Sequence, residues 1–170
     1  LGSSVAVSST AIIGGAPFED KGLAGVNSPL SNYRATDSGA AYLYLVSDPD
    51  VAVEQPSGND LVSGVGTVSF GDVLPGGSVL KTFDFRNTGN ATMNISGVGK
   101  GGTNMADFMV SQAGMLYSLA PGATSSFSVT FSPTALGQRS AILYFYTDDP
   151  DEGSFIINLS GTGVAPEIVV

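Results

Sequence analysis

The sequence predicts an all-β protein whose main part is an immunoglobulin-like antiparallel β-sandwich. Its 23 glycines and 9 prolines, with abundant Ser, Thr, Asn and Val, are typical of short strands joined by tight turns. One stretch, VLKTFDFRNTG at residues 79–89, alternates between polar and apolar side chains over residues 82–86. About seven strand-like segments with turn residues between them are the pattern of a two-sheet sandwich.

The alternating stretch 79–89 defines one strand with a buried face and a wet face. One face carries Val79, Phe83 and Phe85, and the other carries Leu80, Thr82, Asp84 and Arg86. The run Asn87-Thr88-Gly89 then gives a turn signal. This pattern indicates an antiparallel sheet that is covered on one side only.

The first 47 residues differ from the rest of the chain in their pattern of apolar and polar residues. Residues 5–7, 11–13 and 39–46 are apolar and predict three short strands. Between the second and third lies a polar segment, 19–38, rich in Gly, Asn, Ser and Asp. A connection of this length is typical of a binding loop or a mobile surface loop.

The runs SVAVSSTAIIGGAPFED at 4–20 and ATDSGAAYLYLV at 35–46 carry a family likeness. This segment resembles an FG-GAP repeat, the blade unit of integrin-type β-propellers, which are extracellular in the proteins it resembles. Only one unit is present, and the run of aspartates that forms the family's calcium loop is missing. The resemblance therefore implies a β-rich segment that packs against the next domain, another subunit or the rest of a propeller.

After a Pro-containing joint at 47–50, further strands are predicted at 92–98, 107–111, 124–132, 139–147 and 155–161. Within 124–132, Phe127, Val129 and Phe131 point one way and the Ser and Thr residues between them point the other. The chain has no Cys and no Trp, which excludes an antibody-type domain with its disulfide and packed indole.

A second set of motifs runs through residues 50–163. In order they are VSFGDV at 68–73, FRNTGNA at 85–91, LAPG at 119–122, FSPT at 131–134, TDDP at 147–150 and LSGTG at 159–163. Together they resemble the Hydin-type (ASH) immunoglobulin-like domain, called choice-of-anchor D in bacterial surface proteins. We therefore expect an FG-GAP-like β segment at 1–47, a Hydin-type sandwich at 48–163, and a linker or donor strand at 164–170.

Two predicted strands, 40–46 and 141–146, are apolar on both faces. A strand of this kind is usually buried against other protein segments on both of its faces. Tyr42, Tyr44, Tyr144 and Tyr146 are therefore candidate contact residues, covered either by the N-terminal segment packing on the sandwich or by another chain.

The C-terminal residues 166–170, PEIVV, repeat the pattern of residues 49–53, PDVAV. One interpretation is that the chain is a piece of a tandem array of such domains. The other is that Ile168, Val169 and Val170 form a donor strand that adds to a sheet edge of a neighbouring subunit. Such head-to-tail contacts would build a filament.

Composition excludes several classes of function. The chain has no His, the commonest general base and transition-metal ligand. A net charge of −9 with 6 basic residues in total opposes binding to nucleic acid. No run of about 18 apolar residues is present to insert into a membrane. We expect no enzymatic activity.

Two groups of oxygen-bearing side chains are candidate ion or ligand sites. The acidic stretch Asp148, Asp149, Asp151 and Glu152 could hold calcium, but its spacing fits no calcium loop and favours a solvated hairpin turn. The polar segment offers Glu19, Asp20, Asn27, Asn32 and Asp37 as a ligand loop, where a plain polar loop is again favoured. No other cofactor is expected.

These observations favour a non-catalytic structural or adhesive module of a bacterial surface protein, located outside the cell or at its surface. A self-assembling fibre subunit joined by strand donation is one form of this hypothesis. The expected partners are proteins, either other copies of the chain or adjacent domains. The alternatives are a calcium- or carbohydrate-binding accessory domain and an intracellular scaffold domain, as in the eukaryotic relatives of the Hydin-type domain.

Overall fold

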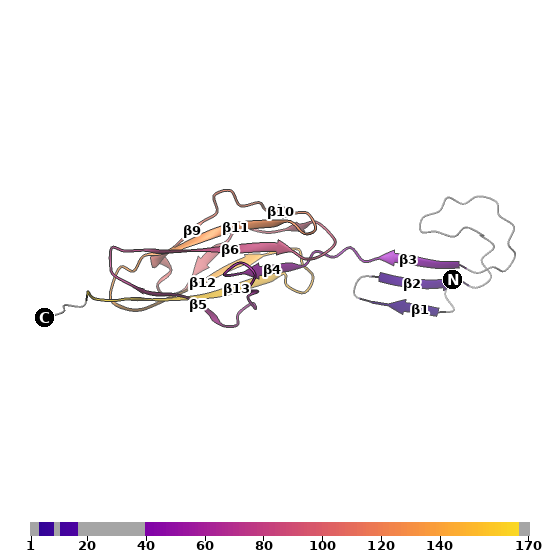
Figure 1. Ribbon diagram of the computed structural model, residues 1–170. Coiled ribbons are helices and arrows are strands. Elements are labelled where there is room, and N and C mark those ends of the chain that lie inside the picture. The colour runs from indigo at the N-terminus through magenta and orange to yellow at the C-terminus, as the bar shows by residue number, and fades with distance from the viewer. Residues whose placement is uncertain (1–3, 9–10, 17–39, 167–170) are drawn as a thin grey trace. The chain divides into compact units, whose positions relative to one another are not determined.

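The computed structural model describes residues 4–8, 11–16 and 40–166, which form β-strands, connecting loops and one short 3-10 helix (Figure 1). The chain divides into two compact units, 1–47 and 48–170. Among the described residues, no helix has the length and apolar character needed to cross a membrane. The predicted all-β class is confirmed.

Unit 1 is a three-stranded antiparallel sheet in the order β1-β2-β3. Its strands are β1 (Ser4–Val7), β2 (Ala11–Ala16) and β3 (Ala40–Leu45). Where β1 and β2 face each other at one end of the sheet, the Ala11 N–H donates to Ser8 Oγ at 3.0 Å. The register aligns Val7 with Ile12 and Ile12 with Tyr44, so one face of this sheet carries a row of large side chains.

Unit 2 contains two four-stranded sheets and one two-stranded pair. The first sheet has the order β4 (Val51–Glu54), β6 (Val79–Asn87), β11 (Thr124–Phe131) and β9 (Phe108–Ser111). The second has the order β5 (Thr67–Val73), β13 (Ser154–Gly163), β12 (Gly137–Tyr146) and β8 (Gly99–Gly101). The small pair joins β7 (Met93–Asn94) to β10 (Ser118–Leu119). Neighbouring strands are antiparallel except β5 and β13.

The core lies between the two four-stranded sheets. Phe83 and Phe85 of β6 are fully buried, as the alternation in the sequence predicts. Phe83 stacks on Phe127 of β11, with ring centroids 5.0 Å apart. Phe85 meets Phe145 of β12 edge to face at 4.7 Å, so the aromatic cluster ties one sheet to the other. The immunoglobulin-like sandwich follows from this packing.

The single strand predicted at 92–98 is wrong. Residues 93–94 form β7, which pairs with β10, whereas β8 begins at Gly99 and pairs with β12 of the second sheet. The chain therefore crosses between pairing partners over 95–98. Gln112 holds this crossing, because its Oε1 accepts from the Val98 N–H at 2.8 Å and its Nε2 donates to the Val98 carbonyl at 3.2 Å.

Candidate functional site: an interaction surface

Four large side chains lie exposed on the outer face of β12 and β13. They are Ile142 (36% exposed), Tyr144 (40%), Tyr146 (58%) and Ile156 (40%), and we call them the outer strip. They share one face because strand side chains alternate, and the intervening residues of β12 point into the core. Ile156 lies directly across from Tyr144 in the β12–β13 register, so the strip is continuous across the two strands.

The Tyr144 ring lies on Gly99 of the edge strand β8. Gly99 is the register partner of Tyr144, and a Cβ placed on it would come within 2.5 Å of the ring atom Cε2. No side chain fits under the ring at that distance. Because Gly99 has no side chain, the Tyr144 ring can pack directly against β8, and Tyr144 remains 40% exposed in this position.

The replacement Gly99→Ala should displace the Tyr144 ring and lower the free energy of unfolding by about 1–3 kcal/mol through overpacking. Urea unfolding measures the loss. Gly101→Ala on the same strand is the matched control, since its added Cβ would meet Ile142 at an ordinary 3.5 Å. Equal effects of the two replacements would contradict the assigned role of Gly99.

The structure brings two of the predicted contact residues together, Tyr144 and Tyr146. Tyr44 is 57% exposed on β3 of unit 1. The backbone of Tyr42 is part of β3, but its side chain lies outside the described part of the chain, as do Ile168, Val169 and Val170. Whether unit 1 packs on the sandwich stays a prediction.

The acidic loop before β13 is less solvated than predicted. Asp149 is only 3% exposed. Its Oδ2 accepts the Val51 N–H at 2.8 Å, and its Oδ1 accepts the N–H groups of Asp151 and Glu152 at 3.1 and 3.2 Å. The prediction of a solvated turn does not hold for Asp149, because this buried carboxylate fixes β4 to the loop.

The other acidic side chains of the loop have separate positions. Asp148 turns away from Asp149 and accepts from the backbone N–H and the side-chain Nδ2 of Asn94, each at 2.7 Å. Carboxylate oxygens of Asp50, Asp149 and Glu152 lie within 4.8 Å of one another and could approach one cation. Asp149 already accepts three backbone hydrogen bonds there, and calcium wants six to eight oxygens. Calcium binding stays a prediction.

The predicted ligand loop lies outside the described residues. This applies to all five of its candidate side chains, Glu19, Asp20, Asn27, Asn32 and Asp37.

The acidic loop contains carboxyl groups whose pKa values move in opposite directions. Burial by itself raises the pKa of Asp149, but the N–H of Val51 and the other hydrogen bonds outweigh burial and leave this pKa below its usual value. Burial, together with the charges of Asp149 and Asp151, raises the pKa of Glu152. The pKa of Asp151 is raised first by its hydrogen bond to Asp149 and second by the negative charge of Asp149.

These directions predict a stability maximum in mildly acidic solution. A carboxyl group with a raised pKa in the folded state stabilises the fold while protonated, so the contributions of Asp151 and Glu152 are lost as pH rises through their folded pKa values. A group with a lowered pKa does the opposite, and the contribution of Asp149 is lost below about pH 4. Urea unfolding between pH 3 and pH 8 measures the profile. A stability that falls steadily from pH 8 to pH 5 would contradict it.

Sequence analysis missed a buried ion pair at the other end of the sandwich. Asp107 is 2% exposed, and its Oδ2 accepts from Arg139 Nε at 2.5 Å. Its Oδ1 accepts from Thr134 Oγ1 at 2.8 Å. Burial raises the pKa of Asp107, but the hydrogen bonds and the charge of Arg139 outweigh burial and hold this pKa below its usual value. The pair joins the 3-10 helix η1 (Met105–Asp107) to β12.

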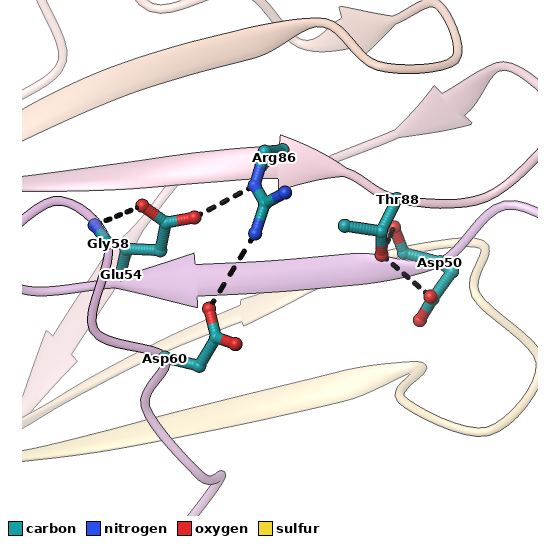
Figure 2. A network of polar contacts seen from close by, with 6 residues as sticks. All are labelled: Asp50, Glu54, Gly58, Asp60, Arg86 and Thr88. Atoms are coloured by element: carbon teal, nitrogen blue, oxygen red, sulfur yellow. Dashed lines mark hydrogen bonds and ion pairs between the residues drawn. The ribbon is translucent and has the colours of Figure 1, made fainter.

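A second polar network surrounds Arg86 on the outer side of β6 (Figure 2). Arg86 Nε donates to Glu54 Oε1 at 2.8 Å, while its Nη2 lies 3.9 Å from Asp60 Oδ1. The other oxygen of Glu54 accepts the Gly58 N–H at 2.6 Å. These contacts hold the loop after β4 against the first sheet, and all three charged groups are used in structural pairs.

Among the hollows on the described part of unit 2 are two that are lined in part by β13. One, of about 390 Å³, lies between the loop after β4 and β13, and Asp60 and Lys81 are the charged residues of its lining. The other, of about 610 Å³, is open and lined by neutral residues of β5, β12 and β13 and of the 102–103 turn. Neither places two carboxylates together in the way that glycoside hydrolysis needs.

Residues 61–164 match a protein-family model, and this match shows to which family the chain belongs. That model is described as Cep192 domain 4, and it spans more than half of the chain. The chain belongs to the Cep192 domain 4 family. This membership supports the ASH-type domain implied by the sequence motifs. The Cep192 domain 4 match does not extend to residues 1–60, so the FG-GAP resemblance stays a prediction.

Solved structures share low sequence identity with the chain. The ASH/PapD-like domain 7 of human CEP192 is 14% identical to this chain. The match covers 85% of this chain and 100% of the CEP192 domain, with a TM-score of 0.48. A Porphyromonas gingivalis protein of unknown function is 11% identical, and the match covers 91% of this chain and 86% of that protein, with a TM-score of 0.49. The Vibrio cholerae VesB protease is 17% identical, and the match covers 66% of this chain and 31% of the protease chain, with a TM-score of 0.42. No curated protein matches the chain significantly.

Proposed function

We propose that the chain is a non-catalytic structural module that binds other protein domains, beginning with a second copy of itself. The observation that carries this proposal is the outer strip. Its four side chains are 36–58% exposed, although the residues between them on β12 are buried in the core. A sheet face with this much apolar surface is suited to being covered by another protein.

The chemistry of the strip favours a protein partner. Tyrosine is enriched at protein interfaces, because its ring supplies contact area and its hydroxyl retains a hydrogen bond. The strip contains two tyrosines and two isoleucines and no charged group. Burying such side chains fully is worth about 1.5–3 kcal/mol each, and the half-exposed ones here would contribute a fraction of that.

Self-association of the full chain tests the proposal. The double variant Tyr144→Ser, Tyr146→Ser should weaken association at least about tenfold, which corresponds to 1.4 kcal/mol. Sedimentation equilibrium at several concentrations measures the association constant. The matched control is Leu80→Ser on β6, because Leu80 is 62% exposed on the outer face of the other sheet. An association constant unchanged by the double variant, or lowered equally by the control, would overturn the proposed use of the strip.

For the location of the module we propose the outside of a bacterial cell. The support is the resemblance of residues 4–46 to an FG-GAP unit, together with the choice-of-anchor form of the Hydin-type domain. An intracellular scaffold is the second candidate, supported by membership in the Cep192 domain 4 family. Antibody labelling of intact and permeabilised source cells separates the two. Labelling of intact cells is expected, and labelling only after permeabilisation would favour the scaffold.

A further inference from the structure

Strand β6 is longer than the edge strand β4 that pairs with it. β4 pairs with residues 84–87 of β6, and Glu54 is the last residue of β4 in that register. The chain then turns away from β6, because the Gln55 N–H donates to the Asn59 carbonyl at 3.0 Å. Within the described part of the chain, residues 79–83 therefore have β11 on one side and no strand on the other.

The backbone groups of Leu80 and Thr82 face this open edge. Successive residues of a strand point their N–H and C=O groups to alternate sides. The Asn87 N–H donates at 3.0 Å to the carbonyl just before β11, and the Thr88 N–H donates at 2.8 Å to the carbonyl of Asp50, just before β4. Steps of two back from Thr88 place the groups of Thr82 and Leu80 on the β4 side. No hydrogen-bond partner for them is found there among the described residues.

Lys81 lies between these two residues, and its side chain points inward. It shares the inner face of β6 with Phe83 and Phe85 and is half-buried. Its Nζ lies 5.8 Å from the ring centroid of Phe70 on β5. Over the described ranges, no carboxylate lies within ion-pair distance of Lys81. An ammonium group without an acidic partner therefore stands at the opening between the two sheets.

The hollow of about 390 Å³ lies beside this lysine. Its lining includes Gln55, where β4 ends, as well as Lys81, residues 67–69 of β5 and residues 156–158 of β13. Asp60 also lines the hollow, but one of its oxygens lies 3.9 Å from Arg86 Nη2. Leu61, Val62, Val65 and Val68 make part of the wall apolar. The hollow thus adjoins the open edge of β6 and offers apolar surface next to one basic group.

We propose that the open edge of β6 binds an extended segment of a partner protein as an added strand. This segment runs antiparallel to β6, as β4 does, and its backbone pairs with Leu80 and Thr82. The residue opposite Lys81 is acidic, and its neighbours two positions away on the same face are apolar and enter the hollow. One acidic residue is favoured over a strongly acidic segment, because the net charge of −9 repels the latter. The inference goes beyond the proposed function and uses a surface different from the outer strip.

The probe that tests this proposal is the peptide Thr-Val-Thr-Glu-Thr-Val-Thr, acetylated and amidated at its ends. Its Glu and Val side chains share one face of an extended strand. In an NMR titration of the full chain, the amide signals of Leu80, Thr82 and residues 67–69 should shift. The same peptide with Gln in place of Glu should bind about fivefold more weakly, as expected for one partly exposed ion pair. The variant K81Q should bind the two peptides equally.

A second measurement uses the unmodified chain, so it does not depend on the folding of K81Q. Methyl groups on the amide nitrogens of the two Thr residues that flank Glu should abolish binding, because these amides face β6. Methyl groups on the amide nitrogens of the two Val residues are the matched control and should leave binding unchanged, because these amides point away. Equal binding of the two methylated peptides would overturn strand addition and show that the hollow takes an acidic ligand without backbone pairing.

The opposite role for Lys81 gives a result of opposite sign. A lysine that points inward at a sheet edge can discourage strand addition. In that role K81Q would bind the Glu peptide more tightly than the unmodified chain does, which would overturn the proposal. Absence of shifts at Leu80 and Thr82 with millimolar peptide would overturn it as well.

Dilution of the chain without peptide separates this edge from self-association. If the signals of Leu80 and Thr82 shift on concentration alone, the edge belongs to a second copy of the chain, and the proposal is overturned. Association through the outer strip should instead shift residues 142–146 and 156. Failure of the outer strip and failure of the β6 edge are therefore distinguishable.

Discussion

The replacement Asp107→Ala should lower the free energy of unfolding by about 3–5 kcal/mol, the usual cost of removing one partner of a buried ion pair. Asp107 is 2% exposed, and the Arg139 side chain that bonds to it is 19% exposed. Without the carboxylate, a mostly buried guanidinium and the Thr134 hydroxyl lose their partner. Urea unfolding at neutral pH measures the loss.

The matched control for this prediction is Asp60→Ala. Asp60 also lies near an arginine, but its side chain is 67% exposed and its oxygen is 3.9 Å from Arg86 Nη2. Exposed pairs of this kind contribute about 0–1 kcal/mol. Similar losses for the two variants would show that the Asp107–Arg139 pair does not support the sandwich in the way described.

The replacement Phe85→Ala should have a comparable effect, about 3–5 kcal/mol, through lost burial and a cavity in the core. Phe85 is fully buried. Its ring centroid lies 5.1 Å from that of Phe127 in the same sheet and 4.7 Å from that of Phe145 in the opposite sheet. The change therefore loosens the contact between the two sheets.

Thr82→Ala on the same strand is the control for Phe85→Ala, because Thr82 is exposed on the outer face of β6. Its effect should stay within about 0.5 kcal/mol. Thermal and urea unfolding measure both variants. A loss from Thr82→Ala as large as that from Phe85→Ala would mean that the two faces of β6 are not assigned correctly.

The faces of β6 and β11 could be predicted from the sequence because strand side chains alternate with a period of two. That local pattern assigns Phe83 and Phe85 to the core without any knowledge of their partners. It also places Ile142, Tyr144 and Tyr146 on the face opposite to Leu143 and Phe145. Pattern analysis could not say whether another part of the chain covers that face, since this depends on contacts between distant segments.

The polar contacts that fix the sandwich could not be predicted for the same reason. Asp107 and Arg139 are 32 residues apart, and Asp149 and Val51 are 98 residues apart, so no local spacing connects them. The acidic loop suggested a solvated turn because charged residues are usually exposed. Asp149 is buried because its carboxylate replaces a strand partner for the Val51 N–H. The break between β7 and β8 escaped prediction because both halves of 92–98 have strand-like residues.

The central claim is that the outer strip is the surface with which the module binds protein, and a nitrogen–proton NMR dilution series of the full chain tests it most directly. On concentration, the amide signals that shift should be those of residues 142–146 on β12 and of Ile156 on β13, while the signals of β6 and β9 stay fixed. Shifts confined to β6, β9 and β11, on the opposite sheet, would contradict the account.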